Sequence, residues 1–204
     1  MLDTKQKIIR AAAELFHQHG VAPVRLQQIA DRAQVSVGNL AYHFKTKEVI
    51  ILAVYEQLGQ EVTNILQKFR QLPTLLDFDN QLSLWLDFQS RYSFFFVTLL
   101  PEPVDAAAQS RATLLSRLNS QLTKRLEYHT QRLILQPNAE TVTLAETIGL
   151  TITYWPLYRT VRKQTIADER AFKALVWSQW YPHFTPRGRS EYQSLIYPLL
   201  FPSS

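Results

Sequence analysis

The sequence predicts an all-α protein. Apolar residues recur at helical spacing along most of the chain, and strand-like alternation bounded by turn residues is absent. The five glycines are scattered at positions 20, 38, 59, 149 and 188. With 46% hydrophobic residues, the 204-residue chain can bury a large core. We therefore expect one or two folded helical domains.

The N-terminal quarter predicts three short helices. The first runs from about Thr4 to His19, and Gly20 is placed to end it. A second covers about 25–33, after a turn at "VAP". A third begins after its predicted N-cap, Ser36, and reaches about residue 43. The residues that we expect the first two helices to bury are Ile8, Ala12, Leu15, Phe16, Leu26, Ile29, Ala30 and Ala33.

A long helix is predicted from about Thr46 to Arg70. Thr46 can cap it, and Glu48 favours its first turn through the helix dipole. Pro73 interrupts the pattern, and Pro156 predicts a kink or break within a later helix. The remaining helical patterns cover 80–100, 110–135, 139–163, 168–184 and 190–201, with breaks at 101–103 and at Pro137.

Positive charge is concentrated at the N-terminus. Residues 1–47 hold seven Lys/Arg and three Asp/Glu, which gives +4, whereas 48–204 hold fifteen and fourteen, which gives +1. A small basic segment on a near-neutral body favours a nucleic-acid-binding head. A solvated basic face explains the charge alone equally well. The charge distribution therefore places a boundary near residue 47, between this basic segment and the near-neutral remainder.

The stretch "VSVGNLAYHFKTK" gives the head its predicted function. Two short helices braced by a third make a helix-turn-helix unit, whose second helix enters the DNA major groove by its N-terminal end. Leu40 and Phe44 are the residues that would hold this helix on its neighbours. Gly38 lets the backbone approach the groove closely. Asn39 can bond adenine edges or phosphate, and Val37 can contact a thymine methyl group.

The segments "IADRA", "VSVGNL", "YHF" and "KTKE" together resemble the N-terminal domain of TetR-type bacterial regulators over about residues 5–55. The resemblance implies an all-helical homodimer. We therefore expect a three-helix DNA-binding domain at 1–47 and a larger ligand-binding and dimerisation domain at 48–204. Three departures stand out. Val24 and Arg25 replace the usual threonine pair, Gln34 replaces the turn glycine, and Ala41 replaces a tyrosine. The expected DNA-binding residues are Arg25, Gln27, Ser36, Val37, Gly38, Asn39, Tyr42, His43, Lys45, Thr46 and Lys47.

Aromatic residues in the second domain have two explanations. Ordinary core is the simpler one for each residue, and a ligand cavity with a few directed polar groups is the alternative. The expected lining is Trp85, Phe88, Tyr92, Phe95, Phe96, Tyr128, Tyr154 and Tyr158. The bands "LTITYWPLY" and "FKALVWSQWY" are too apolar to be left in water. The resemblance implies that they form a four-helix dimer interface, for which we expect Ile152, Trp155, Leu175, Trp177, Trp180 and Tyr181.

Several other classes are disfavoured. The chain has no cysteine, which excludes disulfides, thiolate catalysis and Cys-ligated zinc and suits a reducing cytoplasm. "QVSVG" lacks the first glycine of a nucleophile elbow. His17 and His19 do not share a helix face, so a metal site is poorly supported. The longest apolar runs are too short to span a bilayer. We expect no enzyme, no cofactor, no metal and no membrane partner.

The function predicted from these features is that of a ligand-responsive, homodimeric, DNA-binding repressor. Its expected partners are double-stranded operator DNA, a second copy of itself, and a small apolar or amphipathic effector that releases it from the operator. The alternative is an all-α interaction or small-molecule-binding module with a degenerate head, which the missing threonine pair and Ala41 keep open.

Overall fold

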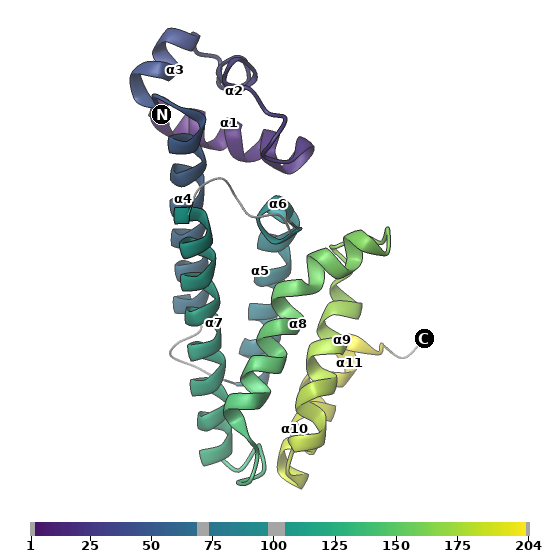
Figure 1. Cartoon of the computed structure of the whole chain (residues 1–204). Coiled ribbons are helices and arrows are strands. Elements are labelled where there is room, and N and C mark those ends of the chain that lie inside the picture. The colour runs from purple at the N-terminus through teal and green to yellow at the C-terminus, as the bar shows by residue number, and fades with distance from the viewer. Residues whose placement is uncertain (1–2, 69–73, 98–104, 203–204) are drawn as a thin grey trace. The chain divides into compact units, whose positions relative to one another are not determined.

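The computed structural model describes residues 3–68, 74–97 and 105–202 (Figure 1). Within these ranges every regular element is a helix, and only an isolated bridge, Leu135 to Phe184, has β geometry. The all-α prediction is therefore confirmed. The breaks predicted at Pro73 and 101–103 lie outside the described residues. The elements are α1 (Thr4–His19), α2 (Leu26–Ala33), α3 (Val37–His43), α4 (Lys47–Lys68), α5 (Leu75–Arg91), α6 (Ser93–Val97), α7 (Asp105–Gln131), α8 (Thr141–Val161), α9 (Glu169–Trp180), the 3-10 turn η1 (Tyr181–His183), α10 (Pro186–Leu195) and α11 (Tyr197–Leu200).

The chain forms two compact units. The first comprises Met1–Val62 and Arg91–Thr113, and the second comprises Thr63–Ser90 and Leu114–Ser204. Helices α4 and α7 each contribute residues to both units. The domain boundary predicted at residue 47 separates the DNA-binding residues from the rest of the chain. This functional boundary stays a prediction.

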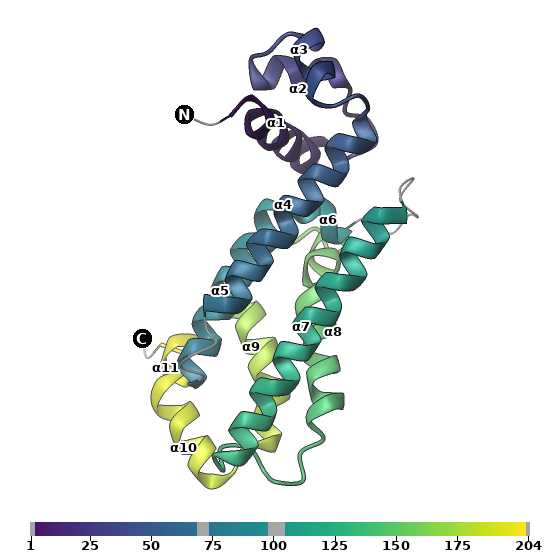
Figure 2. The same cartoon turned by 90° about the vertical axis from the view of Figure 1, so that its left-hand side faces the viewer.

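The first unit is built on α1, α2 and α3, whose inward residues form one small core. Phe16, Ile29 and Leu40 are fully buried, as predicted. Leu26 is the exception, because its side chain stays partly exposed while Val24, just before α2, is 2% exposed. Figure 2 shows these three short helices grouped above the long α4.

Helix α6 joins the core of the first unit. The Phe94 ring meets Phe16 of α1 edge to face, with centroids 5.8 Å apart, and Phe95 meets Tyr55 of α4 at 5.0 Å. The single helix predicted over 80–100 is therefore two, separated at Tyr92. No proline or glycine marks this break. Packing of the aromatic run against α1 and α4 outweighs the local preference for a continuous helix.

The turn between α2 and α3 requires a left-handed backbone. Helix α2 ends at Ala33, and Gln34 follows with φ of 58°. The Val35 N–H donates to Ala30 O (3.0 Å), which closes the turn in the way that glycine usually permits. Gln34 thus keeps the conformation of the glycine that it replaces and carries the steric cost of its Cβ.

Gln34→Gly should raise the free energy of unfolding by up to about 1 kcal/mol, because glycine adopts positive φ without steric cost. Urea denaturation followed by circular dichroism measures the change. Gln34→Ala keeps the Cβ and should leave stability near that of the parent. A glycine variant less stable than the alanine variant would contradict this account of the turn.

Pro156 lies inside α8 without ending it, since the helix continues to Val161. A proline has no backbone N–H, so the carbonyl of Ile152 loses its usual helical donor. The Gln89 side chain of α5 supplies the replacement by donating its Nε2–H to Ile152 O. Gln89 is fully buried, and this bond ties α5 to α8 at the proline.

The second unit has its core among α5, α8 and α9. Trp177 and Trp180 of α9 are fully buried, and Phe78 of α5 lies against both rings at 5.4 and 4.9 Å between centroids. An ion pair crosses this core, from Asp79 Oδ2 on α5 to Lys173 Nζ on α9 at 2.6 Å. Because the pair is buried, the packing of α5 on α9 depends on both charges being present.

Candidate nucleic-acid interface

Helix α3 is fixed from both its start and its inner face. The Ser36 Oγ accepts the Asn39 N–H at 3.1 Å, so Ser36 caps the helix as predicted. Leu40 is fully buried and Phe44 is 2% exposed. These contacts anchor one side of α3 to the head and turn the opposite side to solvent.

The outward side of α3 is small and polar at its first turn and aromatic at its last. Val37 is 39% exposed, and Gly38 and Asn39 are also exposed. Tyr42 is 84% exposed, and its ring meets the half-buried His43 edge to face at 5.2 Å. A tyrosine this exposed keeps both its ring and its hydroxyl available to a partner.

Gly38 is not required by the packing of the head. A Cβ added there would come no closer than 3.9 Å to any heavy atom outside its chain neighbours and its own helix backbone, the nearest being Ser36 Oγ. Its φ lies outside the left-handed region that demands glycine. A side chain at this position would therefore meet only something that approaches α3 from outside.

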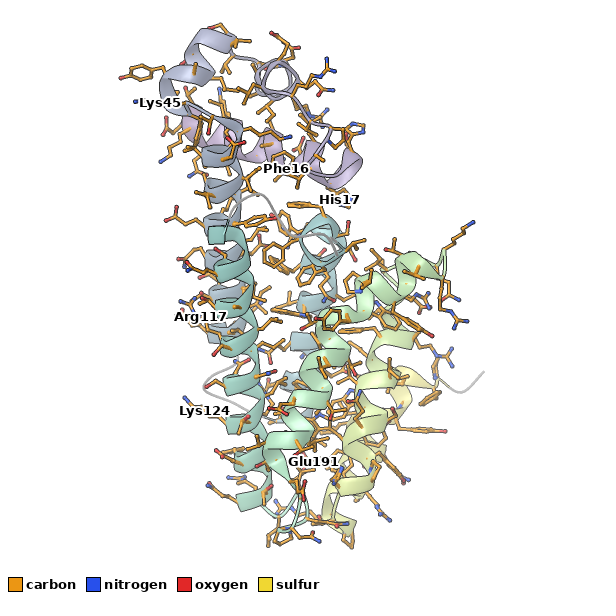
Figure 3. The ribbon with its side chains drawn as sticks, in the orientation of Figure 1. Phe16, His17, Lys45, Arg117, Lys124 and Glu191 are labelled. Carbon is orange, nitrogen blue, oxygen red and sulfur yellow. The ribbon has the colours of Figure 1, made fainter. Side chains whose placement is uncertain are left out.

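The cations of the head divide into paired and available groups. Arg10 and Arg32 both bind Glu14, and the hydrogen bond from Arg32 is the main reason that the Glu14 pKa is lowered. Arg25 and Lys45 are exposed and form no ion pair within the described residues. Figure 3 shows Lys45 at the turn between α3 and α4. Part of the basic charge counted from sequence is thus neutralised within the head.

Lys47 has a structural partner. Its Nζ donates to Ala22 O at 2.9 Å, which ties the turn after α1 to the start of α4, and burial lowers the Lys47 pKa. An ammonium has three N–H donors, so this bond leaves two for a phosphate. Beside it, Thr46 Oγ1 lies 3.5 Å from the Val49 N–H at the start of α4.

The start of α2 compensates for the missing threonine pair. Arg25 is the N-cap, and its backbone N–H donates to Gln28 Oε1 at 2.8 Å. This is the glutamine half of a capping box, and an arginine side chain cannot accept the reciprocal bond. Gln27, also exposed, donates to Asp31 Oδ1 at 2.8 Å along the outer face of the same helix.

The expected ligand-lining aromatics are distributed over both units. Trp85 and Phe88 are buried in the second unit, and Phe95 and Phe96 in the first. The half-buried Tyr92, also in the first unit, donates its hydroxyl to Glu61 Oε2 at 3.0 Å. On α8, the side chains of Tyr154 and Tyr158 are 48% and 49% exposed.

A groove of about 780 Å³ in the second unit includes Tyr128 and none of the other expected lining residues. Sequence reasoning missed it, although a polar face at helical spacing on α7 was the available signal. The groove lies between the last turns of α4 and the middle of α7, and its lining is Thr63, Leu66, Gln67, Ser116, Arg117, Ser120, Gln121, Lys124, Arg125 and Tyr128.

The expected dimer residues also separate by burial. Four of them lie inside their own unit, with exposed fractions of 0–3%, which removes them from the surface that a second copy can contact: Ile152, Trp155, Trp177 and Trp180. Leu175 and Tyr181 remain 44% and 37% exposed. Helix α8 also has an exposed apolar face, formed by Leu150, Tyr154, Tyr158 and Val161, and the first three belong to the band "LTITYWPLY" that was expected at the dimer interface.

Two further features of the described residues concern metal binding and membrane spanning. No group of three or more His, Asp or Glu side chains there is arranged to hold a metal ion. None of the helices in the described ranges combines the length and the apolar character that crossing a membrane requires.

Comparisons with known proteins agree with the geometry of the head. Residues 8–54 match the model of the bacterial regulatory proteins of the tetR family. The HTH-type transcriptional regulator RutR of Escherichia coli K12 is 40% identical over 67 residues, which are 33% of this chain and 32% of RutR. The chain is thus matched to about a third of the length of this curated relative.

Solved structures extend the similarity of fold to nearly the whole chain. A TetR-family transcriptional regulator from Marinobacter aquaeolei VT8 matches with a TM-score of 0.82 and 24% identity, over 95% of this chain and 97% of that one. The SmeT–triclosan complex matches with a TM-score of 0.70 and 14% identity, over 90% and 92% of the two chains. The predicted resemblance to TetR-type regulators is confirmed.

Proposed function

We propose that this chain, whose residues 8–54 match the tetR-family model, is a homodimeric TetR-type transcriptional repressor that a small molecule releases from its operator. In this proposal α3 enters the major groove by its first turn, where Gly38 and Asn39 face the base edges. Arg25, Lys45 and Lys47 contact phosphates on either side and set the position of the head on the duplex. The RNA polymerase is then excluded wherever the operator overlaps a promoter.

The observation that carries the DNA-binding proposal is the open space in front of Gly38. Gly38→Ala should raise the free energy of unfolding by about 0.5–1 kcal/mol, because alanine is the better helix former and meets no clash. It should also weaken operator binding by about tenfold or more, since the new methyl group occupies the space that the DNA backbone or a base edge needs. Operator fragments selected from random duplexes, followed by electrophoretic titration, measure the affinity.

Gly59→Ala is the matched control. Gly59 lies within α4, where an added Cβ would come within 4 Å of no counted heavy atom of the described residues, so the same gain of stability is expected there. Its operator affinity should equal that of the parent. Equal affinity of the Gly38→Ala variant and the parent would remove α3 from the interface.

Dimerisation is proposed through the exposed apolar face of α8. Leu150, Tyr154 and Tyr158 recur at four-residue spacing, so they lie on one side of the helix. Exposed apolar residues in a contiguous row are typical of a partner surface. Leu175 of α9 and Tyr181, just after it, can extend this surface, and the same patch meets itself across a two-fold axis.

The double variant Leu150→Glu/Tyr158→Glu should convert the dimer to a monomer at micromolar concentration, because four carboxylates would face one another across the two-fold axis. Sedimentation velocity measures the change. Leu199→Glu, an exposed substitution on α11, should leave the dimer intact. A parent chain that already sediments as a monomer would refute the proposed assembly.

Release from the operator is proposed to act through α4, which begins directly after the head and ends beside the groove of the second unit. A ligand shifts the protein only if it binds the DNA-incompetent state more tightly. A coupling of about 1–3 kcal/mol would weaken operator binding by roughly 5–150-fold. The solved complex of SmeT with triclosan, a protein of similar fold, supports the idea that this architecture takes small molecules.

A further inference from the structure

The described lining of the groove between α4 and α7 contains cations and no carboxylate. Its charged members are Arg117, Lys124 and Arg125, and its other polar members are neutral amides and hydroxyls. Figure 3 shows Arg117 and Lys124 on the same side of α7. Seven residues separate them, which is about two helical turns. The positive charges therefore line the groove along its length.

Arg125 is the buried cation of this set. Arg125 is only 5% exposed. Within the described residues its Nη1 has no hydrogen-bond partner. Its Nη2 donates to the neutral Gln81 Oε1 at 3.2 Å, and the guanidinium lies over the Phe78 ring at 5.3 Å. Gln81 is itself buried and held by Gln121 at 3.1 Å. The guanidinium is thus fixed in place, and its Nη1 is unpaired within the described residues and covered by neighbouring atoms.

Within the described residues, Arg125 forms no ion pair with a carboxylate. Burial lowers the pKa of its guanidinium to about 10, and the carboxylate that acts against this shift is Asp77. The Asp77 carboxylate already accepts two hydrogen bonds at its Oδ2, from the Thr74 N–H at 2.9 Å and from the Thr74 hydroxyl at 2.8 Å. A buried charge without a counter-ion is costly, and a bound anion would offset that cost.

We propose that this groove is the effector site and that its ligand is a small organic anion, a carboxylate or an ester of phosphate or sulfate. Lys124 and Arg117 attract the acidic group from the rim, and it binds the unpaired Nη1 of Arg125 once the side chains that cover this atom move aside. The apolar body of the ligand lies against Leu66 and the ring of Tyr128. A volume of about 780 Å³ is within the range of small-molecule sites. This inference rests on the proposed function and names the class of its effector.

The fluorescent sulfonate 8-anilinonaphthalene-1-sulfonate tests the proposal, together with N-phenyl-1-naphthylamine, which has the same rings and no charge. The sulfonate should bind the full chain saturably, and the uncharged probe should bind more weakly. Arg125→Met keeps the length of the side chain and removes the charge, and it should weaken sulfonate binding by at least about tenfold. Binding of the uncharged probe should change by less than about twofold. Decanoate and inorganic pyrophosphate, added as competitors, distinguish a carboxylate site from a phosphate site.

Two further variants separate local chemistry from loss of fold. Ser120→Glu places a carboxylate on the exposed lining and should repel the sulfonate, whereas Ser194→Glu on α10 should not. Arg187→Met removes an exposed cation outside the groove and should leave binding unchanged. Sulfonate affinity that is equal in the parent, Arg125→Met and Ser120→Glu would overturn the proposal, and so would an equal loss in Arg187→Met.

Operator titrations distinguish this proposal from the proposed function. Arg125→Met should bind operator like the parent, and the sulfonate should weaken operator binding by the parent while leaving the variant unaffected. If the sulfonate binds through Arg125 and leaves operator affinity unchanged, the groove is not the effector site. If the parent never binds DNA, the function of the head is wrong, and the anion site is still tested by the fluorescence titrations.

Discussion

Replacing Asp79 with leucine should lower the free energy of unfolding by about 3–5 kcal/mol, because it leaves the ammonium of a buried lysine without its main counter-ion. Asp79 is 1% exposed, and its Oδ2 lies 2.6 Å from Lys173 Nζ. Its Oδ1 accepts the Trp177 Nε1–H at 2.9 Å, so the substitution also removes the partner of a fully buried indole. Lys173 Nζ keeps its second partner, Glu169 Oε1, at 2.8 Å. We therefore expect a loss of stability at the lower end of this range.

A double-mutant cycle tests the cause of this loss. Asp79→Leu/Lys173→Met removes both charges, and it should recover more than half of the stability lost by Asp79→Leu alone. Glu14→Gln, at the partly exposed pair with Arg32, should cost no more than about 1 kcal/mol. Urea denaturation measures the four chains of the cycle, which include Lys173→Met alone, and the Glu14→Gln control. Additive losses in the double variant would mean that Asp79 stabilises the fold without coupling to Lys173.

Acid should destabilise the second unit through His129. This residue is 2% exposed, and its ring lies 5.5 Å from that of Trp180. Among the described residues, neither of its ring nitrogens has a hydrogen-bond partner. Burial lowers the pKa of His129 to about 4, and the charges of Arg125 and Arg132 act in the same direction. An unfolded chain binds the proton with a pKa of about 6.5. Between these values the unfolded state takes up more protons, so stability falls as the pH falls.

The expected contribution of His129 is a loss of about 2–3 kcal/mol between pH 7.5 and pH 4.5, from about 1.4 kcal/mol for each pKa unit. His129→Leu should remove that part of the pH dependence, since no hydrogen bond is lost with the imidazole. His19→Gln, at an exposed position of α1, should keep it. If His129→Leu and the parent lose stability equally over this range, the buried histidine is not the cause.

The head was largely predictable from sequence because its signals are local. The bounds of α1, the cap at Ser36 and the burial of Leu40 each follow from a few neighbouring residues. The partners of Lys47 and Arg32 were not predictable. Each bonds to an atom of another helix or turn, Ala22 O and Glu14, whose position only the fold determines.

The second domain was predicted less well, because its helices are apolar on more than one side. Periodicity in α8 does not tell which residues face the core, and the structure buries Trp155 while it exposes Tyr154 and Tyr158. The groove beside Arg125 is formed by two segments about fifty residues apart, residues 63–67 and 116–128. No local pattern could have joined them.

The salt dependence of binding to generic duplex DNA tests the central claim most directly. Two heads that each neutralise about three phosphates, through Arg25, Lys45 and Lys47, should give a slope of log K against log salt of about −5. Lys45→Ala should flatten that slope by about two, one for each head. Absence of binding at low salt, or an affinity that does not change with salt, would contradict the account of this chain as a DNA-binding regulator.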